Sequence, residues 1–247
     1  MQFINAQTGW ITLYNPFNFL KTTNGGKIWN TLYPNSSQFI FFDFIDNSIG
    51  YAIGYDAMFN GLISKTNNGG LNWITVYTGA RGFTALDFVN QDTGWFGAFL
   101  GDDVQILRTT NGGQTLELQY SYMSAGQGIN EVFFVDKPYD GYFYGWFLNN
   151  GFMSKTTNSG FTWSTPVDSV NGLPGDYYWL FFLEKDTGWV VFEPNLNNVK
   201  IYKTQNGGTN WVEQINSDGF AEVRFINQSV GWAGSESICL VGWIRFL

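Results

Sequence analysis

The nine-residue stretch KTTNGGKIW (Lys21–Trp29) decides the fold, because the chain contains five versions of it. The other versions are KTNNGGLNW from Lys65, RTTNGGQTL from Arg108, KTTNSGFTW from Lys155 and KTQNGGTNW from Lys203, so they start 43 to 48 residues apart. We call this stretch the box. Self-similarity at a nearly fixed period indicates an array built from one repeated supersecondary unit.

A second motif runs in phase with the box. It is an apolar run and a polar turn followed by glycine and an aromatic residue, at Gly9-Trp10, Gly50-Tyr51, Gly94-Trp95, Gly141-Tyr142, Gly188-Trp189 and Gly231-Trp232. From each of the first five glycines to the next box threonine the offset is 13 to 16 residues. The two motifs therefore belong to the same repeating unit.

Each unit reads as four short strands. In the first unit, residues 2–5 and 10–14 are apolar or β-branched runs separated by a turn, residues 19–22 lead into the box, and 27–32 lead out of it. Four strands per unit of about 45 residues are typical of a β-propeller blade. A β-helix or leucine-rich array needs a shorter period, and helical repeats need apolar spacing of 3.6 residues, which is absent. A β-sandwich with coincidental turns remains the alternative.

The sequence therefore predicts an all-β fold, a β-propeller of about six four-stranded blades. We expect one domain over residues 1–247, with units at about 1–35, 36–80, 81–125, 126–170, 171–216 and 217–247. The sixth unit has its Gly231-Trp232 but no box, so its blade should be incomplete. Two arrangements stay open: a six-bladed ring with one short blade, or a piece of a larger ring.

The box itself predicts a hairpin turn. Its Asn should fold onto nearby backbone N–H groups, and its Thr should add a second local bond. The fourth box has Ser159 at the first glycine position, so we expect the second glycine to be the obligatory left-handed residue. The closing Trp should pack over the hairpin. The expected structural turn residues are Thr22, Asn24, Gly26, Trp29, Thr66, Asn68, Gly70, Trp73, Thr109, Asn111, Gly113, Thr156, Asn158, Gly160, Trp163, Thr204, Asn206, Gly208 and Trp211.

The pattern T-x-N-x-G-x-x-W resembles the Asp-box, or bacterial neuraminidase repeat, with Asn in place of the usual Asp. The longer unit is similar to the propeller family that includes the photosystem II assembly and stability factor, and to secreted bacterial repeat proteins. The likeness covers nearly the whole chain; the third box departs from it by ending in Leu116. It implies a propeller whose boxes are structural turns, and an extracellular or periplasmic location. The sequence shows no signal peptide, so the compartment stays unknown.

The composition of the chain excludes several classes of binding partner. With 12 basic and 20 acidic residues the net charge is −8, which argues against nucleic acid or anionic membranes. The longest apolar stretches are too short to span a bilayer, so no membrane insertion is expected. A single cysteine, Cys239, excludes an internal disulfide and is expected to be a buried strand residue.

The chain has no histidine, which excludes His-based nucleophilic catalysis and the usual zinc sites. A sialidase needs three converging arginines, and the four here, Arg81, Arg108, Arg224 and Arg245, lack that context. A glycosidase with two carboxylates stays open. Its candidates fall mostly in turns, where solvation explains them: Asp102, Asp103, Glu131, Asp140, Glu184 and Asp186. Asp102-Asp103 is also a weak candidate for calcium. We therefore predict no catalytic residues, cofactor or metal.

Lys21, Lys65, Arg108, Lys155 and Lys203 share one box position. They could dock an acidic partner, but a solvated strand end whose aliphatic stem covers the neighbouring Trp explains them better. Two functions are weighed. The first is a monomeric, non-catalytic module that binds a protein or glycan through loop faces rich in Tyr, Phe, Asn and Gly. The second is a carbohydrate-active hydrolase. The scarcity of paired acids in the loops favours binding.

Overall fold

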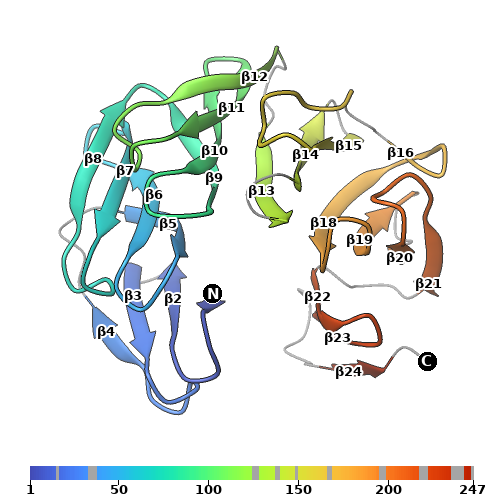
Figure 1. Cartoon of the computed structure of the whole chain (residues 1–247), viewed down its shortest axis with the longest axis horizontal. Coiled ribbons are helices and arrows are strands. Elements are labelled where there is room, and N and C mark those ends of the chain that lie inside the picture. Colours follow the sequence, from blue (N-terminus) through green and yellow to red (C-terminus); the bar gives the residue numbers. More distant parts are fainter. Residues whose placement is uncertain are drawn as a thin grey trace. The chain divides into compact units, whose positions relative to one another are not determined.

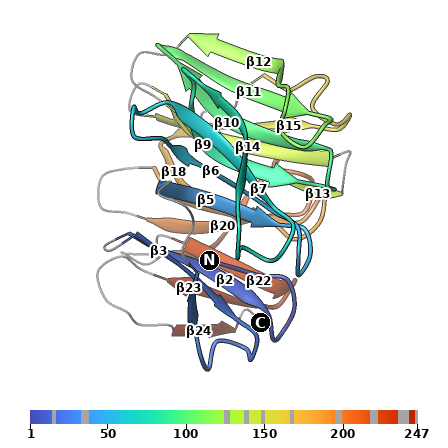
Figure 2. The same ribbon diagram turned by 90° about the vertical axis from the view of Figure 1, so that its left-hand side faces the viewer.

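The computed structural model describes residues 1–14, 17–32, 38–123, 128–136, 140–147, 150–165, 169–194, 199–216, 222–234 and 242–245. Its described regular elements are all β-strands (Figures 1 and 2). The chain forms two compact units, Met1–Phe133 and Phe134–Leu247. Cys239 lies outside the described residues. That residues 1–247 form one domain stays a prediction.

Unit 1 contains three four-stranded antiparallel sheets, each formed by consecutive strands. The first holds β1 (Gln2–Phe3), β2 (Gly9–Tyr14), β3 (Phe17–Thr22) and β4 (Asn30–Leu32). The second holds β5 (Gln38–Phe44), β6 (Gly50–Tyr55), β7 (Gly61–Thr66) and β8 (Ile74–Gly79). The third holds β9 (Gly82–Phe88), β10 (Gly94–Leu100), β11 (Asp103–Thr109) and β12 (Glu117–Met123).

Unit 2 begins within β13 (Ile129–Asp136), which forms a three-stranded sheet with β14 (Asp140–Phe147) and β15 (Asn150–Thr156). A two-stranded hairpin follows, β16 (Ser169–Val170) and β17 (Leu173–Pro174). A four-stranded sheet holds β18 (Asp176–Phe182), β19 (Gly188–Glu193), β20 (Lys200–Thr204) and β21 (Val212–Asn216). The last sheet holds β22 (Glu222–Asn227), β23 (Val230–Gly234) and β24 (Gly242–Arg245).

Among the described residues, the sheet of the fourth repeat has three strands rather than the predicted four. The sequence offers a reason. Pro166 follows the box Trp163 by three residues, and proline cannot donate a ladder hydrogen bond. The β16–β17 hairpin occupies the following stretch of chain.

The aromatic residues of five of the six Gly-aromatic pairs belong to the hydrophobic core. Trp10, Tyr51, Trp95, Tyr142 and Trp189 are all fully buried. The preceding glycine is required because the ring of a first-strand Phe lies across it: a Cβ at Gly50 would lie 2.6 Å from Phe44 Cδ1. In the sheet, Gly50 pairs with the box threonine Thr66. The constant spacing between the two sequence motifs therefore reflects the register between the second and third strands.

Each four-stranded sheet has two distinct ends. The turn between its first and second strands and the box lie at one end, because Gly50 at the start of β6 pairs with Phe44 and with Thr66. We call this the box end. The hairpin between the second and third strands lies at the opposite end, which we call the hairpin end. Among the described residues, no helix is long and apolar enough to cross a membrane.

Candidate functional site

The box forms the same hydrogen-bonded turn each time. In the second sheet, Thr66 Oγ1 accepts the N–H groups of Gly70 at 3.0 Å and Asn68 at 3.3 Å, and it donates to Asn68 Oδ1 at 3.0 Å. Asn68 Oδ1 also accepts the N–H of Asn72 at 2.9 Å. The other boxes repeat this network around Thr22, Thr109, Thr156 and Thr204. Each box threonine is almost completely buried.

Both glycine positions of the box are left-handed. The second position has φ of +92° at Gly70. The first position is also left-handed, with φ of +69° at Gly69 and +61° at Ser159. The difference is one of degree, because a φ near +60° suits a small polar L-residue far better than one near +90°. Comparison of the five sequences revealed only the stricter position.

The box end also joins neighbouring sheets. Trp10 stacks on Phe44 of the next sheet, with centroids 3.7 Å apart, and its indole N–H donates to the carbonyl of Gly69 at 3.0 Å. Lys21 lies over the Trp10 ring at 4.8 Å and donates to the carbonyl of Asn47 at 3.4 Å. Box, turn and aromatic pair thus form one joint.

The same joint recurs in both units. Within unit 1, Tyr51 stacks on Phe88 at 3.6 Å and Lys65 donates to the carbonyl of Gln91. Within unit 2, Tyr142 stacks on Phe182 at 3.8 Å and Trp189 stacks on Phe225 at 3.6 Å. Lys155 and Lys203 donate to the carbonyls of Lys185 and Gln228.

The five equivalent cations therefore have structural partners. Each lies 4.8 to 5.6 Å from the centroid of the aromatic ring of its own Gly-aromatic pair, a cation–π distance. Sequence analysis expected a solvated strand end whose aliphatic stem covers the neighbouring ring; in the structure the charged group itself lies over that ring. Burial lowers the pKa of Lys21. These contacts leave the cations poorly placed to serve as a docking surface.

The carboxylate candidates lie in different places. Asp102 and Asp103 form the β10–β11 turn at the hairpin end of their sheet, whereas Glu184 and Asp186 are exposed in the β18–β19 turn at the box end of theirs. Glu131 lies within β13, and the side chain of Asp140 is outside the described set. Glu184 accepts a hydrogen bond from Gln228 at 2.9 Å. Among the described residues, no group of three or more potential metal ligands of the His, Cys, Asp and Glu types occurs.

The most unusual surface of unit 1 is the tip of the β6–β7 hairpin, at the hairpin end. Met58 and Phe59 are 83% and 84% exposed, although both are large and apolar. Phe59 is left-handed, with φ of +62°, which is costly for a bulky L-residue. Sequence analysis predicted loop faces rich in Tyr, Phe, Asn and Gly, but it could not show that these two apolar side chains point outward.

Asp56 holds this tip in place. Its carboxylate accepts the N–H of Met58 at 2.8 Å and both the backbone N–H and the side-chain amide of Asn60 at 2.9 Å. The side-chain bond from Asn60, followed by the backbone bonds, lowers the pKa of Asp56. A hydrogen-bonded turn therefore presents two exposed apolar side chains, an arrangement that is unfavourable for the isolated molecule and suits a binding surface.

Neighbouring segments extend this surface. The carbonyl of Arg81, between β8 and β9, packs so tightly on Gly61 that no side chain fits there. The Arg81 guanidinium donates to Gln105 at 3.0 Å, and the partly exposed Phe99 lies against Gly82. Leu100, the last residue of β10, is also partly exposed at 39%, and we call Met58, Phe59, Arg81, Phe99 and Leu100 the hairpin surface.

Comparison with known proteins gives matches at the level of structure. No protein-family model matches the sequence, and no curated protein matches it. The chain is similar to YCF48 from Cyanidioschyzon merolae, at 13% identity over 92% of this chain and 76% of that one, with a TM-score of 0.62. YCF48 bound to D1 peptide aligns at 14% identity over 94% and 86% of the two chains, with a TM-score of 0.48.

Enzymes share the architecture. The Niastella koreensis GH74 enzyme aligns at 15% identity over 92% of this chain and 42% of its own length, with a TM-score of 0.65. A puromycin hydrolase variant complexed with PGG aligns at 8% identity over 92% and 40%, with a TM-score of 0.62. The likeness to YCF48 and the antiparallel four-stranded sheets confirm the predicted all-β propeller fold. At these identities the likeness concerns the fold alone.

Proposed function

We propose that this chain is a non-catalytic, monomeric propeller module that binds a partner protein through the hairpin surface. The exposed Met58–Phe59 tip is the observation that supports the proposal most directly. A bulky residue in a left-handed conformation costs about 1–2 kcal/mol, and the exposed rings and methyl groups gain nothing from solvent. Burial against a partner would recover about 1.5–3 kcal/mol for each such side chain.

The hairpin surface matches a protein partner better than it matches a glycan. Met58 offers a flexible thioether and Phe59 a ring without a polar atom, and both types are common anchors in protein interfaces. A sugar instead needs several hydrogen-bond partners around an aromatic platform. At this tip the Asp56 carboxylate is already engaged by three internal N–H donors. The surface is therefore suited to apolar contact.

Site-specific photo-crosslinking tests the assignment. We place p-benzoylphenylalanine at Phe59 and, as a matched control, at Phe161, which is 61% exposed in the fourth box. The expected result is a discrete protein adduct from position 59 alone, competed by the unmodified chain but not by the Phe59→Gly chain. Equal crosslinking from both positions, or glycan-array binding lost in Phe59→Gly, would contradict a protein partner at this surface.

The hydrolase alternative makes a separate prediction. The carboxylates described above are mostly exposed turn residues, a position that solvation alone accounts for. We expect no turnover of fluorogenic sialosides, peptides or esters. Glycoside turnover that is abolished by removing Asp102, Glu131 or Glu184 would overturn the non-catalytic assignment.

A further inference from the structure

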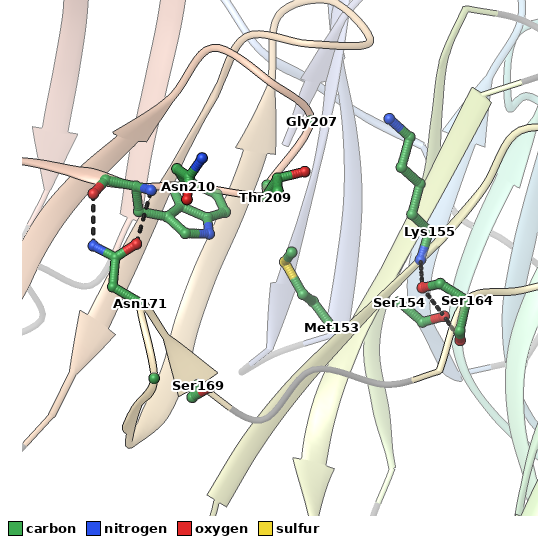
Figure 3. A pocket seen from close by; sticks show the side chains of 12 residues that line it. Met153, Ser154, Lys155, Ser164, Ser169, Asn171, Gly207, Thr209 and Asn210 are labelled. Atoms are coloured by element: carbon green, nitrogen blue, oxygen red, sulfur yellow. Dashed lines mark hydrogen bonds between the residues drawn. The ribbon is translucent and has the colours of Figure 1, made fainter.

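A groove of about 780 Å³ lies within unit 2, along the outer side of β15 (Figure 3). One wall is β15 itself, with Met153 pointing into the space, and the opposite wall is the fifth box, around Gly207. Asn171 supports the far side, because its side chain bonds the backbone carbonyl and N–H of Trp211 at 2.6 and 2.9 Å. The groove is independent of the hairpin surface.

The chain itself shows what normally occupies this position. The third strand of the second sheet, β7, has the sequence GLISKT. The third strand of the fourth repeat has the sequence GFMSKT over residues 151–156. In the second sheet, β8 pairs with β7 along its length, from Lys65↔Ile74 to Gly61↔Gly79. Nearly the same strand therefore has a partner in one sheet and a groove beside it in the other.

The fourth unit begins a fourth strand and then departs from it. The N–H of Ser164 donates to the carbonyl of Lys155 at 2.8 Å, and Ser164 Oγ accepts the N–H of Lys155 at 3.0 Å. Ser164 follows the box Trp as Ile74 does in the second sheet. Strand alternation then directs the N–H and C=O groups of Met153 and Gly151 to the same outer edge. For these two residues the structure gives pairing with β14 only, so the edge is open among the described residues.

The box glycines show which side chain is missing. A Cβ at Gly70 would lie 3.2 Å from Leu32 of β4, and one at Gly113 would lie 3.2 Å from Val76 of β8. A fourth-strand apolar side chain thus packs on the second glycine of the next box in both cases. At Gly208 the nearest side chain of the neighbouring sheet is instead the third-strand Met153, and both residues line the groove.

We propose that this groove binds an extended peptide segment of a partner protein, which adds to β15 as the fourth strand of its sheet. Main-chain hydrogen bonds to Gly151 and Met153 provide the affinity, as in other cases of β-strand addition. A Val- or Leu-sized side chain of the peptide packs against Gly208 and Met153. Because neighbouring side chains of a strand alternate, the segment carries apolar residues at every second position facing the groove.

A peptide with the sequence of β8, Ile-Thr-Val-Tyr-Thr-Gly, is a suitable probe because β8 pairs with β7, whose sequence is nearly identical to that of β15. We titrate this synthetic peptide, with solubilising ends, to about 1 mM against the ¹⁵N-labelled full chain. The expected result is slowed amide exchange at Gly151 and Met153. N-methylation of alternate peptide amides then tests the geometry. Methylation of one alternate set should abolish binding, and methylation of the other should leave it intact, because an edge strand bonds its neighbour with every second amide.

A matched pair of variants locates the site. Thr209 is exposed and lines the groove, and the equivalent residue of the fourth box is the exposed Phe161, so the turn accepts phenylalanine there. Thr209→Phe should weaken peptide binding by at least about tenfold. The equivalent Gln114→Phe, next to a sheet that keeps its fourth strand, should not. Unchanged exchange at Gly151 and Met153, equal effects of both methylation sets, or dimerisation of the chain through this edge would overturn the proposal.

Discussion

Replacing the box threonine Thr109 with valine should destabilise the protein by about 2 kcal/mol. The Thr109 side chain is 1% exposed, and its hydroxyl accepts the Gly113 N–H at 2.9 Å and the Asn111 N–H at 3.3 Å. Valine keeps the shape but removes the acceptor, and a buried N–H left without a partner costs about 1–3 kcal/mol. The bond to Asn111 is longer and that residue is partly exposed, so water can replace it in part.

The adjacent Thr110 provides the matched control, because its side chain is exposed. Thr110→Val should change stability by no more than about 0.5 kcal/mol. Thr109→Ser keeps the hydroxyl and should cost at most about 1 kcal/mol for the lost methyl group. Urea unfolding followed by tryptophan fluorescence gives the free energies of unfolding.

Amide exchange at Gly113 reports on the hydrogen bond itself. It should accelerate in Thr109→Val and stay unchanged in Thr110→Val. Equal unfolding free energies for the two valine variants, together with unchanged exchange at Gly113, would refute the view that this hydroxyl holds the box.

Three further predictions concern the joints between sheets. Lys21→Met should lose about 0.5–1 kcal/mol of unfolding free energy, because it removes the cation over Trp10 while keeping the stem; an unchanged melting temperature would contradict this. Gly113→Ala should destabilise more than Gly112→Ala, since φ is +89° against +67°, and equal urea midpoints would disprove the difference. Burial raises the pKa of Tyr51 above the value of about 10 that it has in the unfolded chain. The resulting contribution to the free energy of unfolding is fully present below pH about 10 and is lost as the pH rises toward the folded-state pKa. Stability should then fall less steeply with pH in Tyr51→Phe, by up to about 1.4 kcal/mol per pH unit.

Much of the fold could be predicted because local chemistry repeats. The order of strands follows from alternating apolar residues, and the boxes follow from Asn and Gly in fixed positions. The register is also encoded, because Gly50 pairs with Thr66 in the sheet and the two motifs keep that phase. These features depend on residues near one another in the chain, so a single sequence suffices to identify them.

Contacts between sheets could not be predicted in the same way. Lys21 and Trp10 are paired within one sheet, but that Lys21 also reaches the carbonyl of Asn47 depends on how two neighbouring sheets pack, which sequence spacing does not specify. The edge of β15, which is open among the described residues, was equally hidden, although Pro166 in the sequence indicates that a fourth strand there would lack a ladder hydrogen bond. The outward direction of Phe59 depends on a left-handed backbone that no sequence rule assigns to phenylalanine.

The joints also indicate where binding can occur. At the box end, the N–H of Gly69 donates to the carbonyl of Ser48, and the carbonyl of Gly69 accepts from Trp10 and Lys21. A partner arriving there would have to displace bonds that hold neighbouring sheets together, at a cost of about 0.5–1.5 kcal/mol for each. In the part of the chain that the structure describes, neither Phe59 at the hairpin end nor Gly151 at the β15 edge forms such a bond between sheets. Recognition is therefore expected on the surfaces that sheet assembly leaves unused.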